Sequence, residues 1–94
     1  MEATENDVGV EDEVANVLGK KYVVIIFDDT IHEMGEVVTQ IIKAIHCTPQ
    51  KAEQIMFEAH KTGRAVVILA GKERCEHVAD ILEQIRLGTK IEEA

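Results

Sequence analysis

Two adjacent carboxylates, Asp28 and Asp29, directly follow an unbroken apolar run, and His60 lies further along the chain. An Asp beside an imidazole could serve as an acid–base pair in catalysis. The same groups could bind an ammonium group, which offers three hydrogen-bond donors and no acceptor. In a third interpretation the aspartates cap the next helix and His60 is half-buried in the fold. The residues alone leave ammonium binding and the structural role open.

Catalysis has the least support in the sequence. There is no Ser or Cys nucleophile in a recognisable turn, no Gly-rich phosphate loop and no cofactor motif. His46-Cys47 together with Cys75-x-His77 could supply four zinc ligands. However, neighbouring helical residues point about 100° apart, and the first pair lacks the usual two-residue spacer. The sequence therefore predicts a protein that is not an enzyme and holds neither a cofactor nor a metal ion.

Composition narrows the class of partner. The chain of 94 residues has 18 acidic and 10 basic side chains, a net charge of −8. Phosphate backbones and anionic membranes both require a basic face, so we expect no nucleic acid and no membrane partner. No apolar run approaches the roughly 18 residues of a membrane span, and the acidic N-terminus is unlike a signal peptide. Two cysteines are too few for a disulfide framework, which predicts a cytoplasmic protein.

The chain divides into two parts. Residues 1–20 are rich in Glu and Asp and carry only scattered aliphatic residues, which predicts a flexible acidic N-terminal extension. Residues 21–94 form the folded core.

Hydrophobic periodicity predicts three strands and three helices in this core. A β-branched run is typical of a buried strand, and apolar residues at i, i+3, i+4 and i+7 indicate one face of a helix. The expected strands are Lys21–Phe27, Arg64–Ala70 and Thr89–Glu92, and the expected helices are about Glu33–Ile45, Pro49–Lys61 and Lys72–Arg86.

Helix-end signals support these bounds. Thr30 and Glu33 have the spacing of a capping box, and Thr48 before Pro49 is a strong start signal. Gly63 and Gly88 are expected to end the helices that precede them. The order β-α-α-β-α-β predicts an α+β two-layer sandwich, with a three-stranded antiparallel sheet and three helices on one face.

Two motifs resemble one known family. Residues 28–34, Asp-Asp-Thr-Ile-His-Glu-Met, are similar to a pattern N-D-D-Y/H-T-P-M that ends the family's first strand. Residues 56–63, Met-Phe-Glu-Ala-His-Lys-Thr-Gly, resemble its M-x-x-V-H box followed by a glycine. The spacing between them matches without a gap, and the similarity runs from about Tyr22 to Ile91. The chain thus resembles the Clp protease adaptor ClpS, the N-degron recognition adaptor family.

The resemblance implies a function. A ClpS adaptor binds substrates through a free N-terminal Phe, Tyr, Trp or Leu and delivers them to a ClpA- or ClpC-type AAA+ unfoldase. The residues implied for the amine are Asp28, Asp29, Thr30 and His60, and those implied for the hydrophobic pocket are Met34, Val37, Met56, Ala59 and Leu87.

The chain departs from the family pattern at three of these positions. Asp28 stands where the family has Asn, and Thr30 stands where it has a second Asp. The amine would therefore still meet one carboxylate, but at position 28 instead of position 30. Ala59 stands where the family usually has Val. Because Ala lacks two methyl groups, we expect a deeper pocket that accepts bulky aromatic residues at least as well as Leu.

The resemblance also implies a docking surface for the N-domain of the unfoldase. Glu73 and Glu76 match acidic positions of the family's third-helix region, and the acidic extension matches its N-terminal extension in place and character. A monomer is expected. Two alternatives stay open: a ClpS-like regulator whose N-degron recognition is altered or lost, and a non-catalytic interaction domain of similar fold, such as the C-terminal domain of the ribosomal stalk protein.

Overall fold

Six elements follow one another in the order β-α-α-β-α-β in the computed structural model, which describes residues 19–94. They are β1 (Tyr22–Phe27), α2 (Met34–Ile45), α3 (Pro49–Thr62), β2 (Arg64–Ala70), α4 (Lys72–Glu83) and β3 (Thr89–Glu93). The order confirms the predicted fold class. The predicted flexible extension, residues 1–20, lies outside the described residues except for its last two positions.

The sheet is built around β1. This strand pairs in antiparallel fashion with β2 on one side and with β3 on the other. Val24 and Ile26 are fully buried and point into the core, as a β-branched run predicts. One extra residue of β2, Val67, forms a bulge between the partners of Val24 and Ile25, so that Val67 and Ile68 are both buried in succession.

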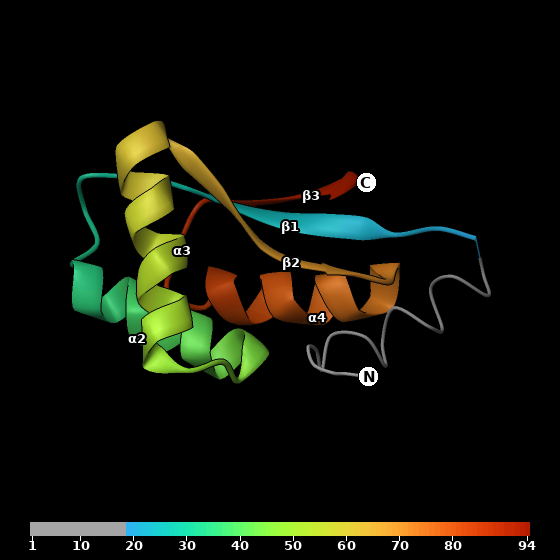
Figure 1. Ribbon diagram of the computed structural model, residues 1–94, viewed down its shortest axis with the longest axis horizontal. Coiled ribbons are helices and arrows are strands. Elements are labelled where there is room, and N and C mark those ends of the chain that lie inside the picture. The colour runs from blue at the N-terminus through green and yellow to red at the C-terminus, as the bar shows by residue number, and fades with distance from the viewer. Residues whose placement is uncertain (1–18) are drawn as a thin grey trace.

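The three helices form the second layer. Figure 1 shows α4 running along the sheet, with α2 and α3 grouped at one end of the molecule. α4 packs directly on the strands, α3 packs against β2, and α2 packs on both other helices. The core between the layers is almost entirely aliphatic; its largest fully buried side chains are Ile26, Ile41, Leu82, Val24 and Val78. In the part of the chain that the structure describes, no helix has the length and apolar character of a membrane span.

The ends of α3 confirm the start and stop signals read from the sequence. The Thr48 hydroxyl accepts a hydrogen bond from the Lys51 N–H at 3.1 Å, and Pro49 occupies the first turn. At the other end Gly63 is left-handed, with φ of 96°, and its N–H donates to the Ala59 carbonyl. Both ends of α3 are fixed by these hydrogen bonds. The helix therefore holds Met56, Ala59 and His60 in a defined position.

The predicted capping box at the start of α2 is wrong. Glu33 is the N-cap residue, but no side chain caps this helix. Instead the Asp29 carboxylate accepts hydrogen bonds from the N–H groups of Ile31 and His32, at 3.0 and 2.9 Å. An Asp readily forms such a turn with the residues two and three positions on. The turn from Asp29 to His32 therefore replaces the cap expected from Thr30.

The predicted end of α4 is also wrong. The helix ends at Glu83 rather than at Arg86, and the next residues form tighter turns in which the Arg86 N–H donates to the Glu83 carbonyl. Arg86 itself adopts the left-handed conformation, with φ of 61°, whereas Gly88 does not. This early turn leaves Leu87 buried under the end of β1.

Candidate functional site

The end of β1 is held by two backbone hydrogen bonds to segments far away in the sequence. The Phe27 N–H donates to the Gly88 carbonyl at 3.1 Å, and the Asp28 N–H donates to the Gly63 carbonyl at 3.0 Å. Gly63 ends α3 and Gly88 precedes β3, so both segments converge on the residues where the apolar run gives way to carboxylates. This convergence brings side chains of α2, α3 and the α4–β3 segment around Asp28.

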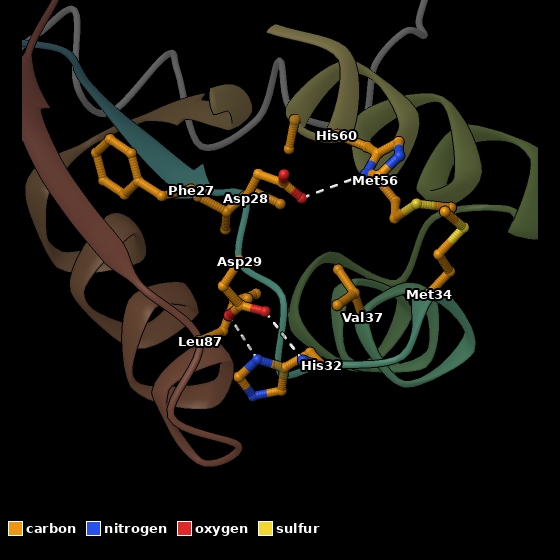
Figure 2. Close-up of a pocket in the computed structure, with 11 residues that line it drawn as sticks. Phe27, Asp28, Asp29, His32, Met34, Val37, Met56, His60 and Leu87 are labelled. Carbon is orange, nitrogen blue, oxygen red and sulfur yellow. Dashed lines mark hydrogen bonds and ion pairs between the residues drawn. The ribbon is translucent and has the colours of Figure 1, made fainter. Parts of the chain in front are cut away.

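A cavity opens beside this strand end. Its volume is about 90 Å³. Four buried apolar side chains, from α2, α3 and the α4–β3 segment, form its inner wall: Val37, Met56, Ala59 and Leu87. Met34 also lines it but is 45% exposed, which places this side chain at the mouth. All five residues predicted for a hydrophobic pocket therefore line one cavity; Met34, Val37, Met56 and Leu87 are labelled in Figure 2.

A carboxylate and an imidazole face each other at the rim. Asp28 Oδ1 lies 3.5 Å from His60 Nδ1, and both side chains remain partly exposed, at 38% and 54%. In Figure 2 these two groups stand above the apolar side chains of Val37 and Met56. The rim therefore combines negative charge with a ring nitrogen that can accept a hydrogen bond when neutral.

Asp29 lines the same cavity but is bound differently from Asp28. Besides its two backbone hydrogen bonds, its Oδ2 lies 2.6 Å from Nδ1 of His32. The N–H of His32, followed by the His32 side chain and the N–H of Ile31, lowers the pKa of the Asp29 carboxyl. Asp29 is thus ionised and already supplied with donors, whereas Asp28 has room for another partner.

Not every predicted amine-binding residue lies on the cavity wall. Thr30 is exposed and is not among the residues that line the cavity, so its role remains a prediction. Three lining residues were not predicted: Ile26, Phe27 and His32. The ring of Phe27 points away from the cavity (Figure 2) and lies 6.0 Å from the Arg64 guanidinium. The one sequence signal for the contact between His32 and Asp29 is their spacing of three residues.

The zinc arrangement considered from sequence does not form. Among residues 19–94, no group of three or more His, Cys, Asp or Glu side chains could hold a metal ion. Cys75 is buried in the core, where its thiol donates to the Tyr22 and Ala70 carbonyls, and Cys47 lies beyond the end of α2. Glu73 and Glu76 are exposed on α4 and are not part of the cavity.

The geometry is suited to binding a small ligand. The residues that line this cavity, all within the described part of the chain, include no Ser, Thr or Cys that could act as a nucleophile. A closed apolar wall with a few polar groups at its mouth is the usual form of a small-ligand site. A cationic group joined to a compact apolar group would satisfy both parts of the site at once.

Comparison with known proteins identifies the family to which the chain is similar. The family model described as "ATP-dependent Clp protease adaptor protein ClpS" matches residues 18–89. The ATP-dependent Clp protease adapter protein ClpS of Gloeobacter violaceus is 35% identical over 72 residues, which cover 76% of this chain and 77% of that protein. The structure of Agrobacterium tumefaciens ClpS2 bound to L-phenylalaninamide superposes with a TM-score of 0.76 at 20% identity, over 80% of this chain and 98% of that one.

The fold and the apolar cavity with its charged rim define a protein with a small-ligand site. The chain belongs to the ClpS family of Clp protease adaptors. The resemblance read from residues 28–34 and 56–63 is therefore confirmed, and with it the prediction that the protein is not an enzyme, since the family consists of non-catalytic adaptors.

Proposed function

We propose that this adaptor binds a free protein N-terminus whose first residue is bulky and apolar. The observation that carries the proposal is the joint position of Asp28 and His60 at the mouth of an apolar cavity. The first side chain of the substrate would enter the cavity, and its α-ammonium group would donate hydrogen bonds to the Asp28 carboxylate and the His60 ring. The L-phenylalaninamide bound to A. tumefaciens ClpS2 supports this, since that ligand carries both an α-amine and an aromatic side chain.

Blocking the amine tests the proposal. Acetylation removes the positive charge and leaves one N–H donor, so we expect a peptide with N-terminal Phe to lose binding by about 10- to 100-fold, the range for a hydrogen bond between charged groups. Fluorescence anisotropy with a dye at the peptide's C-terminus measures this.

The control is a peptide with a free N-terminal Ser and Phe at the second position, which should bind weakly. Equal affinity for free and acetylated Phe peptides would contradict amine recognition. If neither peptide bound, the regulator that has lost N-degron recognition would be the better description of this protein.

We further propose that the adaptor delivers its substrate to a ClpA- or ClpC-type AAA+ unfoldase. Glu73 and Glu76 are exposed on α4, away from the cavity, so a partner could dock there while a peptide is bound. Basic residues of the unfoldase N-domain would then contact this face of α4. The adaptor would act as a monomer in the cytoplasm. The unfoldase would engage the acidic N-terminal segment of the adaptor.

Deleting residues 1–18 separates binding from delivery. The cavity is built entirely from later residues, so the shortened protein should bind the Phe peptide with unchanged affinity. Degradation of a model substrate with N-terminal Phe by the unfoldase and its protease should stop. Replacing the same segment with a Gly/Ser sequence of equal length shows whether length or acidic character matters. Unchanged degradation after the deletion would rule out a role for the segment.

A further inference from the structure

The His32 ring is enclosed between two hydrogen-bond acceptors. Nδ1 lies 2.6 Å from Asp29 Oδ2, and Nε2 lies 2.5 Å from the backbone carbonyl oxygen of Ile85. The His32 side chain is only 8% exposed, so water has little access to either nitrogen. A neutral imidazole has one donor and one acceptor nitrogen, but here both partners can only accept. Both contacts are hydrogen bonds only when the ring is protonated and donates from each nitrogen.

The electrostatic surroundings favour that form. The Ile85 carbonyl, then the Asp29 carboxylate, and to a smaller extent Glu36, raise the pKa of His32 above its ordinary value of 6.5, against the opposing effect of burial. These are the charged and polar groups that face the ring: Asp29 from its own loop, Glu36 from α2, and the carbonyl from the segment after α4. The Ile85 carbonyl lies beyond the last residue of α4, near the negative end of the helix dipole, where a cation is stabilised.

The two acceptors belong to two segments that are far apart in the sequence and that both contribute to the cavity. Asp29 adjoins the rim residue Asp28, on the loop between β1 and α2. Ile85 is two residues before Leu87, which forms part of the apolar wall. The hydrogen bonds from one ring to these two segments therefore join the rim segment that carries Asp28 to the segment that carries Leu87.

A second contact holds the same end of α4. Gln40 of α2 is 3% exposed, and its side-chain nitrogen donates to the Ile81 carbonyl at 2.6 Å. This bond fixes α4 relative to α2, but it cannot titrate. His32 and its partner Asp29 are therefore the components of this junction whose hydrogen bonds depend on pH.

We propose that His32 is a positioning residue of the pocket: its protonated ring holds the Asp28–Asp29 loop and the Leu87 segment at the spacing that the bound N-terminus requires. His32 does not touch the ammonium group in this arrangement; it acts through Asp29 and the Ile85 backbone. The part of the proposal that concerns ligand affinity rests on the proposed N-terminus binding, whereas the coupling of His32 to Leu87 does not.

The direction of the pH effect follows from the two pKa shifts. The raised pKa of His32 means that the junction stabilises the fold fully below about pH 6.5 and loses this contribution as pH rises through the folded-state pKa. The lowered pKa of Asp29 means that its contribution is present above about pH 3.8 and is lost as pH falls through the folded-state pKa. The junction is thus complete between these limits and opens on the alkaline side when His32 loses its proton.

The first test needs no ligand. In the full chain, NMR follows the His32 ring and the Leu87 methyl groups between about pH 5 and pH 9, a range that includes the ordinary imidazole pKa. We expect the Leu87 methyl shifts to change with the same midpoint as the His32 ring. In His32→Gln, which cannot titrate, this transition should vanish, and in His77→Gln, which replaces an exposed histidine of α4, it should persist. Leu87 shifts that do not follow His32 would overturn the proposal.

The second test measures affinity for a Phe peptide over the same range. Effects of pH on the peptide and on the rest of the protein are common to all variants, so the comparison between variants isolates His32. From low to high pH, the wild type and His77→Gln should lose about tenfold more affinity than His32→Gln, the size expected for a hydrogen bond to a charged group. The same pH dependence in all three would overturn the positioning role. If no peptide bound at any pH, the proposed function would fail. The pH dependence of the Leu87 methyl shifts would still decide whether the junction exists.

Discussion

Replacing Asp28 by Ala should weaken binding of a Phe peptide by about 10- to 100-fold, the range for losing a hydrogen bond between charged groups. Asp28 faces His60 across 3.5 Å at the cavity mouth, whereas Asp29, the other carboxylate on the cavity wall, is bonded to His32 at 2.6 Å. His60→Ala should cost about tenfold, since a neutral acceptor contributes less than a carboxylate. Isothermal titration calorimetry measures both losses.

The Asp28 variants also separate charge from hydrogen bonding. Asp28→Asn keeps an acceptor oxygen in the same place and introduces the residue of the family pattern, so it should lose less affinity than Asp28→Ala. Asp80→Ala is the matched control, because it removes one exposed carboxylate from α4 and changes the net charge equally. If Asp80→Ala weakened binding as much as Asp28→Ala, the effect would come from net charge and not from contact with the amine. Full affinity in Asp28→Ala would exclude Asp28 from the site.

Filling the space beside Ala59 should change which first residue the adaptor prefers. Ala59 is 4% exposed and lies on the cavity wall beside Met56 and His60. Its small side chain leaves room that two methyl groups would occupy in Ala59→Val. We expect the wild type to bind peptides starting with Phe or Trp at least as tightly as one starting with Leu. In Ala59→Val the Trp peptide should lose about tenfold or more, since overpacking a closed site costs about 1–3 kcal/mol.

The Leu peptide is the internal control for this variant, because its shorter side chain should fit either form with little change. A series of peptides starting with Leu, Phe, Trp and Ile, measured by anisotropy against wild type and Ala59→Val, gives the whole comparison. Thermal unfolding shows whether the variant remains folded. A clear preference of the wild type for Leu over the aromatic residues would show that the space beside Ala59 is not used by the ligand.

Much of the fold could be predicted from local patterns. The β-branched run of β1, the Thr48-Pro49 start of α3 and Gly63 at its end each depend on a few neighbouring residues, and the structure has all three. The cavity residues followed from a resemblance that combined two motifs, since Met34 and Val37 lie in one and Met56 and Ala59 in the other. Periodicity alone would place these residues on helix faces without saying that the two faces share a cavity.

The errors lie where one local interaction displaced another. Thr30 and Glu33 have the spacing of a capping box, yet Asp29 accepts the two N–H groups that precede α2 and so forms a different turn. Gly88 is the residue that a sequence reading would choose to end α4, but the left-handed residue is Arg86. In both places the sequence offered two local solutions, and the structure contains the one that the pattern did not favour.

The sequence by itself therefore determined the strand that ends in two carboxylates, the helices that follow and the apolar composition of the pocket. Only the tertiary structure distinguished the two aspartates, leaving Asp28 open at the rim and binding Asp29 to His32. The reason is distance along the chain: the second acceptor of His32 is a backbone carbonyl 53 residues away. A carbonyl carries no sequence signal, and it meets the ring only because α4 ends early and packs against α2.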